Sequence, residues 1–366
     1  MTHIIAIANQ KGGVGKTTTA VNLAASLAVA EQRTLLIDGD PQGNATSGSG
    51  LQGEQITGTV YDALIGERSL DEVILRAIQF AHLDVAPTTP DLAGAEIELI
   101  DRENRELAMR DAIAPIRDRY DYILIDCPPS LGLLTINMLA AADAVLIPVQ
   151  CEYYALEGLS QLLNTVHRVQ QSVNPDLAID GVLLTMYDAR LNLSRQVVTD
   201  AREYFGAKVF DTIIPRNVRL AEAPSFGKPI VLYDIASVGA QSYLSVAREL
   251  VQRHSISRNA SAEPTTESNE APTPELIAEP NAQRRAEPGG EVNIESDAEL
   301  PLERRTEPIA HLQAEPHSDS YAASELAVEP HADAPPSDNA QTAPAPVIGQ
   351  HTSSRTSVTE HLPEAQ

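Results

Sequence analysis

The sequence predicts an α/β protein whose mostly parallel sheet is covered by helices on both faces and is followed by a disordered tail. Short, uniformly apolar runs alternate with longer stretches whose apolar residues recur at helical spacing. Strands that are apolar along their whole length are typical of parallel sheets buried on both faces. Near residue 255 the alternation stops, and the composition becomes acidic and rich in proline.

The expected elements follow one another along residues 1–254, with no sign of a second folded domain. The first strand, 3–8, reads His-Ile-Ile-Ala-Ile-Ala, and the helix after it, 17–30, carries apolar residues at positions i, i+3, i+4 and i+7. Further strands are expected at 34–37, 122–125, 144–149, 179–186 and 209–214, and further helices at 59–64, 105–119, 156–173, 193–205 and 237–252.

A glycine-rich loop joins the first expected strand to the first helix. Glycines let several backbone N–H groups converge on one point, and the helix that follows adds its positive end. A polyphosphate is therefore the expected ligand: Lys16 would reach the β- and γ-phosphates, and the Thr17 hydroxyl would bind Mg²⁺. The loop fits the phosphate-binding pattern G-x-x-x-x-G-K-[ST], except for Gln10 at the first glycine position, and it reads Lys11-Gly12-Gly13-Val14-Gly15-Lys16-Thr17-Thr18.

Acidic residues follow two of the expected strands. Asp126 comes directly after strand 122–125, whereas Asp38 and Asp40 follow strand 34–37. Because ligands of open α/β sheets bind at the carboxyl ends of the strands, Asp126 suits the residue that holds hydrated Mg²⁺. Asp38 or Asp40 could hold Mg²⁺, orient the attacking water, or only cap the next turn.

Together with segment 214–225, these motifs resemble the ParA/Soj family of chromosome- and plasmid-partition ATPases, which has a deviant phosphate loop and belongs to the MinD/ParA superfamily. The resemblance covers residues 1 to about 252. It implies a P-loop NTPase fold for residues 1–254, ATP and Mg²⁺ as cofactors, and weak intrinsic ATPase activity. Lys11 resembles the family's signature lysine, which reaches the partner's nucleotide in an ATP-bound sandwich dimer. Asp40 resembles the residue whose loss blocks hydrolysis but leaves dimerisation.

The resemblance also implies a switch for chromosome or plasmid partition. The ATP-dependent homodimer would bind double-stranded DNA without sequence preference, and a ParB-like centromere-binding partner would stimulate hydrolysis and so release it. Arg190 and Arg219 fall where the family carries arginines for DNA binding. Lys11, Lys16 and Asp40 are thus the candidate catalytic residues, and Thr17 and Asp126 the metal ligands. The nucleotide-binding set is Lys11, Gly12, Gly13, Val14, Gly15, Lys16, Thr17, Thr18, Pro215 and Asn217, of which Pro215 and Asn217 would contact adenine.

Three alternatives use the same fold. The same ATPase cycle could position another cargo, such as a chemoreceptor array or a microcompartment. A MinD-like membrane-cycling ATPase would need a basic amphipathic helix at the carboxyl terminus, where this sequence is acidic and rich in proline. A metabolic enzyme of the superfamily that phosphorylates a small carboxylate would need a substrate motif, and none is evident.

Charge and composition differ between residues 1–254 and residues 255–366. The net charge is −25, of which residues 255–366, with 20 acidic and 6 basic residues, carry −14 and residues 1–254 carry −11. DNA binding must therefore rest on a local basic patch, which a dimer would double. The segment 255–366 repeats Ala-Glu-Pro without apolar periodicity, so we expect a disordered low-complexity tail. With no signal peptide and no apolar run near 20 residues expected, the prediction is a cytoplasmic, nucleoid-associated protein that does not bind membranes.

Overall fold

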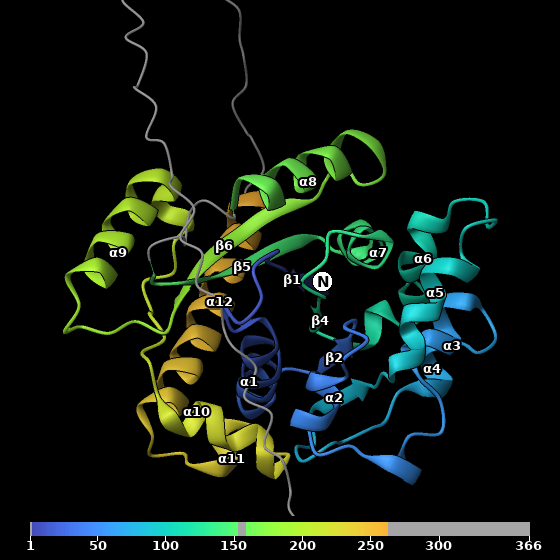
Figure 1. The fold of residues 1–366 in the computed structure, drawn as a ribbon, viewed down its shortest axis with the longest axis horizontal. Coiled ribbons are helices and arrows are strands. Elements are labelled where there is room, and N and C mark those ends of the chain that lie inside the picture. The colour runs from blue at the N-terminus through green and yellow to red at the C-terminus, as the bar shows by residue number, and fades with distance from the viewer. Residues whose placement is uncertain (1, 153–158, 263–366) are drawn as a thin grey trace, which may run out of the picture. The chain divides into compact units, whose positions relative to one another are not determined.

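Six parallel strands form one sheet in the computed structural model, which describes residues 2–152 and 159–262 (Figure 1). The strand order is β3-β2-β4-β1-β5-β6. The register pairs both Ile7 and Asp38 with Asp126, so the carboxyl ends of the three central strands lie level. The strands are β1 (His3–Ile7), β2 (Thr34–Asp38), β3 (Leu83–Ala86), β4 (Tyr122–Asp126), β5 (Ala144–Gln150) and β6 (Ala178–Thr185).

Helices cover both faces of this sheet (Figure 1). Helices α1 and α12 pack against each other on one face, while α3, α6, α7, α8 and α9 contribute to the core on the other. The helices are α1 (Lys16–Val29), α2 (Asn44–Gly48), α3 (Val60–Ile65), α4 (Leu70–Val73), α5 (Ala95–Glu98), α6 (Ala108–Ile113), α7 (Leu133–Ala141), α8 (Leu159–Ser172), α9 (Asn192–Phe205), α10 (Val218–Glu222), α11 (Ile230–Tyr233) and α12 (Val238–Ala262).

The apolar strand residues divide between two cores because successive side chains of a strand point to opposite faces. In β1, Ile4 and Ala6 belong to the core beneath α3 and α7, whereas Ile5 and Ile7 belong to the core beneath α1 and α12. Burial on both faces explains why these strands are apolar throughout. The predicted α/β fold with a parallel sheet between two helical layers is confirmed.

The strand expected at 209–214 is wrong. Val209 makes only an isolated bridge to Val182 of β6. Although Phe210 and Ile214 donate their N–H groups to carbonyls of β6, Asp211 and Thr212 donate theirs to the Glu249 carboxylate of α12, at 2.8 and 3.0 Å. Because a charged helix residue competes for the donors, the segment lies along β6 without joining its ladder.

The helix expected at 105–119 is also wrong as a single element. The segment forms α6 between two short 3₁₀ turns, Arg105–Leu107 and Arg117–Arg119. Pro115 lacks the N–H that a continuing helix needs, and α6 ends two residues before it. In addition, Asn137 of α7 donates to the Arg105 carbonyl at 2.9 Å, a carbonyl that a continuous helix would use.

Three further elements differ from expectation in extent. Strand β3 was not predicted, because it is four residues long and contains Asp84. Helix α8 is described from Leu159, so the start of the helix expected at 156–173 lies outside the described residues. The change of composition at residue 255 falls within α12, which ends at Ala262, and the predicted tail beyond it lies outside the described residues.

Candidate nucleotide-binding site

The glycine-rich loop connects β1 to α1 at the carboxyl edge of the sheet. Gly13 and Gly15 have φ angles of 75° and 91°, in the left-handed region that favours glycine, and Gly15 caps the amino end of α1. Asn9 donates to the Pro148 carbonyl of β5 at 2.7 Å, and the Thr185 hydroxyl of β6 donates to the Val14 carbonyl at 2.8 Å. These two hydrogen bonds fasten the loop to β5 and β6.

Lys16, the first residue of α1, is a buried cation. Its side chain is only 7% exposed, and its Nζ donates to the Lys11 carbonyl at 3.3 Å. Burial lowers the pKa of Lys16, which the nearby carboxylate of Asp126 partly counteracts. An anionic ligand at the loop would form charge-assisted hydrogen bonds with this buried ammonium group and so offset the cost of burying it.

Asp126, the last residue of β4, is the strongest indication of a metal. It is fully buried, and neither carboxylate oxygen has a hydrogen-bond partner among the described residues. Burial raises the pKa of Asp126 well above its usual value, and the nearby Asp38 carboxylate raises it further. Because Thr17 lies close by at the start of α1, a hydroxyl and an unpartnered carboxylate are available to Mg²⁺.

The structure distinguishes Asp38 from Asp40. Asp38 is fully buried, and its Oδ2 accepts hydrogen bonds from both the N–H and the hydroxyl of Thr46, each at 2.7 Å. Burial raises the pKa of Asp38 to about 6. Asp40 is 7% exposed, and its Oδ1 accepts from the N–H of Gln42 at 3.0 Å. Within the described part of the chain its Oδ2 makes no hydrogen bond, so Asp40 is the carboxylate available to a ligand.

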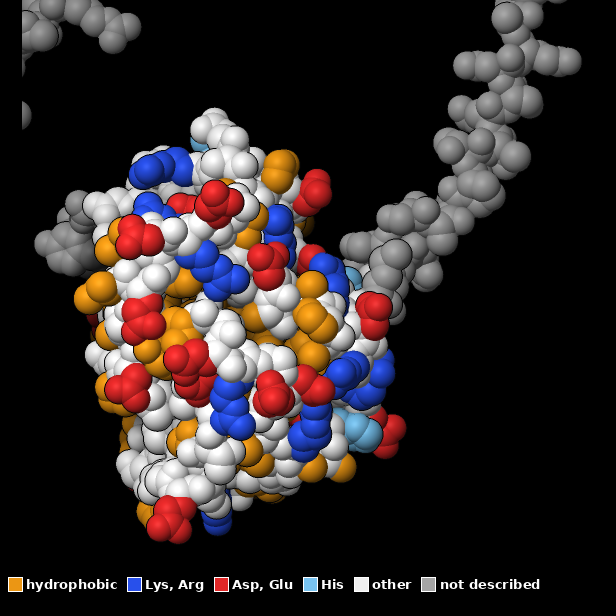
Figure 2. Space-filling model, turned by 90° about the vertical axis from the view of Figure 1, so that its right-hand side faces the viewer, with side chains coloured by type: hydrophobic (Ala, Val, Ile, Leu, Met, Phe, Trp, Pro, Cys, Tyr) orange, Lys and Arg blue, Asp and Glu red, His pale blue; other side chains and the backbone are white. Residues whose placement is uncertain are grey.

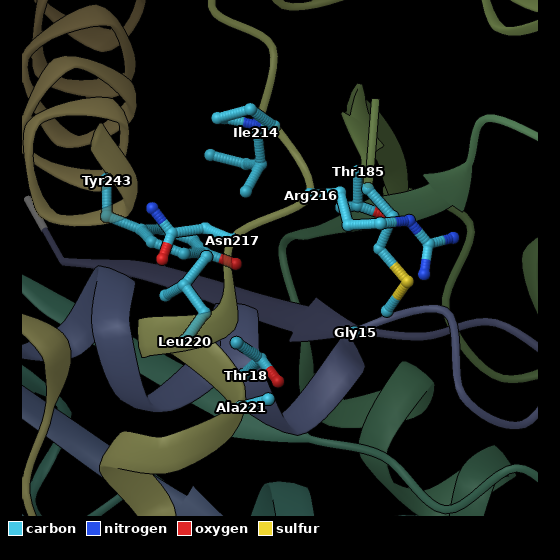
Figure 3. Close-up of a pocket in the computed structure, with 11 residues that line it drawn as sticks. Gly15, Thr18, Thr185, Ile214, Arg216, Asn217, Leu220, Ala221 and Tyr243 are labelled. Carbon is cyan, nitrogen blue, oxygen red and sulfur yellow. The ribbon is translucent and has the colours of Figure 1, made fainter. Parts of the chain in front are cut away.

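A pocket of about 180 Å³ opens beside the loop and is lined by Gly15 and Thr18 of the loop and helix α1 (Figure 3). Pro215 and Asn217 line it from the segment after residue 214. Asn217 caps α10, since its Oδ1 accepts from the Arg219 N–H at 2.8 Å. Its amide NH₂ makes no hydrogen bond with the described residues and is left as a donor for a ligand.

Sequence reasoning missed seven residues of this pocket. Four of them lie in the segment 214–225 that carries the family resemblance, and the three outside it are Thr185, Met186 and Tyr243. The rule that ligands bind where strands end could have found the first two, since β6 ends at Thr185. Met186 has a φ of 52°, an uncommon value for a residue other than glycine. Tyr243 comes from α12, and its hydroxyl lies 3.2 Å from that of Thr19 on α1, a contact that no local pattern indicates.

The candidate DNA-binding arginines lie outside the pocket, and both are paired with acidic residues. Arg190 contacts both oxygens of Asp188, at 2.9 and 2.6 Å. Arg219 pairs with Glu222 at 2.9 Å and more loosely with Asp234 at 3.6 Å. These carboxylates partly offset the positive charge that a phosphate backbone would meet.

The face around α3 to α6 carries mixed charges. Basic side chains lie among acidic and hydrophobic ones over this face (Figure 2). Arg76 pairs with Asp84 at 2.9 Å and also with Asp71, to which Arg119 is bonded as well. This face therefore offers no extended positive field for a polyanion. No helix in the described part of the chain is both long and apolar enough to cross a bilayer.

Comparisons with known proteins agree on one family. A family model described as an AAA domain matches residues 2–179. Chromosome partitioning protein ParA of Myxococcus xanthus is 62% identical over 251 residues, which are 69% of this chain and 88% of that protein. Sporulation initiation inhibitor protein Soj of Bacillus subtilis is 59% identical over 250 residues, 68% of this chain and 98% of that protein.

A solved structure shares the fold at lower identity. Cobyrinic acid a,c-diamide synthase from Mycobacterium smegmatis, solved with bound ADP and magnesium, aligns with a TM-score of 0.62 and 38% identity. The alignment covers 70% of this chain and 97% of that one.

Proposed function

Because this chain belongs to the ParA/Soj family of chromosome-partitioning ATPases, we propose that it is a Mg²⁺-dependent ATPase that works as a nucleotide switch. The observation that carries the proposal is the fully buried Asp126, whose carboxylate oxygens have no hydrogen-bond partner in the described part of the chain, beside the buried Lys16 at the phosphate loop. Both buried charges are costly as they stand, and ATP with Mg²⁺ would compensate both. Thr17 and Asp126 would hold the metal.

The chemistry we propose is attack by water on the γ-phosphate, in line with the leaving group. Lys16 and the N–H groups of the loop lie where they would stabilise the charge that develops on the phosphate oxygens. Asp40, one of whose carboxylate oxygens makes no hydrogen bond within residues 2–152 and 159–262, would orient the attacking water. When bound, Mg²⁺ would supply charge neutralisation at the phosphates. In the pocket, Pro215 and the free amide NH₂ of Asn217 would contact adenine.

Lys11 would couple nucleotide binding to dimerisation. It stands at the entrance of the loop, where its backbone N–H is held by Asn9 at 3.0 Å while its side chain is left for other contacts. A lysine is a mobile point charge, well suited to reach a phosphate across a subunit interface. ATP would thus join two subunits, and the dimer would present a doubled basic surface to DNA in the cytoplasm. A ParB-like partner would stimulate hydrolysis and release the dimer from the nucleoid.

The comparisons favour partition over the alternatives. The two partition-family relatives are 62% and 59% identical, against 38% for the diamide synthase, so a metabolic reaction is the less supported reading. A chromosome is favoured as cargo by the name of the Myxococcus relative. A chemoreceptor array, a microcompartment or a plasmid as cargo would use the same cycle and would pass the tests below. A membrane surface would be the outcome if the ATP-bound protein sedimented with liposomes and not with DNA.

Size-exclusion chromatography of the Asp40→Ala variant tests the switch. With ATP and Mg²⁺ we expect a dimer, because the variant retains the phosphate loop and the metal ligands but cannot complete hydrolysis. With ADP or without nucleotide we expect a monomer. If the variant stayed monomeric with ATP and Mg²⁺ while still binding the nucleotide, the proposed switch would be wrong.

DNA binding is tested by Arg219→Ala in the Asp40→Ala background. We expect weaker retention on non-specific duplex DNA and a shallower salt dependence, by about 0.9 in log–log slope for each phosphate that the protein no longer neutralises. Arg33→Ala is the matched control, because Arg33 also forms a surface ion pair, with Asp121 at 2.8 Å. Arg33 directly precedes β2 and therefore lies at the amino ends of the strands, away from the phosphate loop. Equal DNA affinity of the two variants would contradict the assignment of Arg219.

A further inference from the structure

Thr46 closes the loop that carries Asp40. Asp38 ends β2 and Thr46 lies in α2, and the residues between them form this loop. The Asp38 Oδ2 accepts both the Thr46 N–H and the Thr46 hydroxyl, each at 2.7 Å. The same hydroxyl oxygen accepts the N–H of Thr88 at 2.9 Å. The Thr46 hydroxyl is thus a bridge between the end of β2 and the segment that follows β3.

The bridge is buried and uses the hydroxyl both as a donor and as an acceptor. Asp38 is fully buried, and Thr46 and Thr88 are each only 3% exposed. Water therefore cannot replace the bond, and a buried polar group left unpaired is costly. A hydroxyl donates one hydrogen bond while accepting another, so serine could replace this threonine but valine could not.

The other end of the loop is also fixed. The Gly39 N–H donates to the Asp126 carbonyl at 2.9 Å. A Cβ at Gly39 would lie 2.8 Å from that carbonyl oxygen and 2.9 Å from Cε of Met138, so the backbone is pressed against β4. Asp40 follows immediately, and its N–H contacts Asp38 Oδ1 at 3.3 Å. The position of Asp40 is therefore restricted by two residues that are held in place on either side of it in the chain, Gly39 and Thr46.

We propose that Thr46 is a positioning residue for ATP hydrolysis, whose hydroxyl, by joining Asp38 to Thr88, holds Asp40 at the nucleotide. This inference rests on the proposed function, in which Asp40 orients the attacking water. Thr46 acts through the loop and touches neither nucleotide nor metal. Its loss is expected to affect the hydrolytic step more than nucleotide binding, because the phosphate loop is fastened separately to β5 and β6.

The test compares Thr46→Val, Thr46→Ser and Thr34→Val. We expect Thr46→Val to lower kcat for ATP by up to about 100-fold, the effect of a small misplacement at a reacting centre, with KM little changed. Thr46→Ser should retain most of the rate. Thr34 is the matched control: it is also buried, and its hydroxyl donates to the Gln32 carbonyl at 2.9 Å, but at the other end of β2. Thr34→Val should lose stability without losing rate.

The outcomes separate a positioning role from a structural one. A wild-type kcat in Thr46→Val would overturn the inference, and so would a fall in rate that Thr46→Ser shares or that Thr34→Val reproduces. If Thr46→Val does not fold, Thr46→Ala, which also removes the hydroxyl, decides by the same criteria. Should the unmodified chain bind ATP without hydrolysing it, the proposed function itself fails, and this inference fails with it.

Discussion

Replacing Asp126 by asparagine is expected to stabilise the nucleotide-free protein and to abolish its Mg²⁺-dependent ATPase activity. The carboxylate is fully buried and has no hydrogen-bond partner among the described residues, and burial raises its pKa more than the nearby Lys16 lowers it, so its charge works against folding. Asparagine has a similar shape and no charge, and the melting temperature should rise. The same change removes the metal's charged ligand, and the rate should fall on the order of 100-fold or more.

A pH series tests the cause of this stabilisation. The pKa values of Asp126 and Asp38 both lie above their usual range in the folded chain, that of Asp38 at about 6. A carboxyl group whose pKa is raised by folding contributes stability at low pH and loses that contribution as the pH rises through its folded pKa. The nucleotide-free protein should therefore lose stability as the pH rises through about 6, and Asp126→Asn should lose less.

Asp143→Asn is the matched control for this variant. Asp143 stands at the other end of the sheet, just before β5, and accepts two hydrogen bonds from Arg117, at 2.7 and 2.8 Å. Because this carboxylate has its partner, its replacement should lower stability and leave the ATPase rate unchanged. ATPase activity equal to wild type would refute the metal assignment, whereas a lower melting temperature of Asp126→Asn would refute the claim that the buried charge is destabilising.

Replacing Lys16 by methionine is expected to weaken ATP binding on the order of 100- to 1000-fold, because truncating one partner of a buried, hydrogen-bonded charge pair costs about 2–5 kcal/mol of binding free energy. Methionine fills the space of the lysine stem but lacks the ammonium group. Lys16 is 7% exposed and lies beside Asp126 and Asp40, so the variant also leaves these carboxylates without their cation. Isothermal titration with ATP and Mg²⁺ measures the effect.

Lys11→Ala separates binding from dimerisation. Its side chain lies at the loop entrance and makes none of the contacts that fasten the loop. We expect Lys11→Ala to bind ATP almost as the unmodified protein does, yet to remain monomeric. If Lys11→Ala and Lys16→Met lost ATP affinity equally, Lys11 would belong to its own subunit's site, and its proposed role across the interface would be wrong.

The fold was predictable where it depends on residues that are neighbours in the sequence. Apolar strands and helical spacing predicted the parallel sheet, and the phosphate loop was recognisable because strand, glycines, lysine and threonines adjoin one another in the chain. Pro115 is a local signal as well, because a proline predicts that a helix ends before it, as α6 does. The strand expected at 209–214 had no such signal, because Glu249, from a distant helix, takes two of its donors.

The sequence by itself determined that this chain has a phosphate loop before a helix and an aspartate at the end of a strand, because those features depend on neighbours in the chain. Only the tertiary structure decided which of Asp38 and Asp40 has a carboxylate oxygen available to a ligand. Asp38 accepts two hydrogen bonds from Thr46, whereas one oxygen of Asp40 makes no hydrogen bond with any residue that the structure describes. The physical reason is that a buried polar group takes the partner that the packing of the sheet and its loops brings within hydrogen-bond distance, and that partner can lie anywhere in the chain.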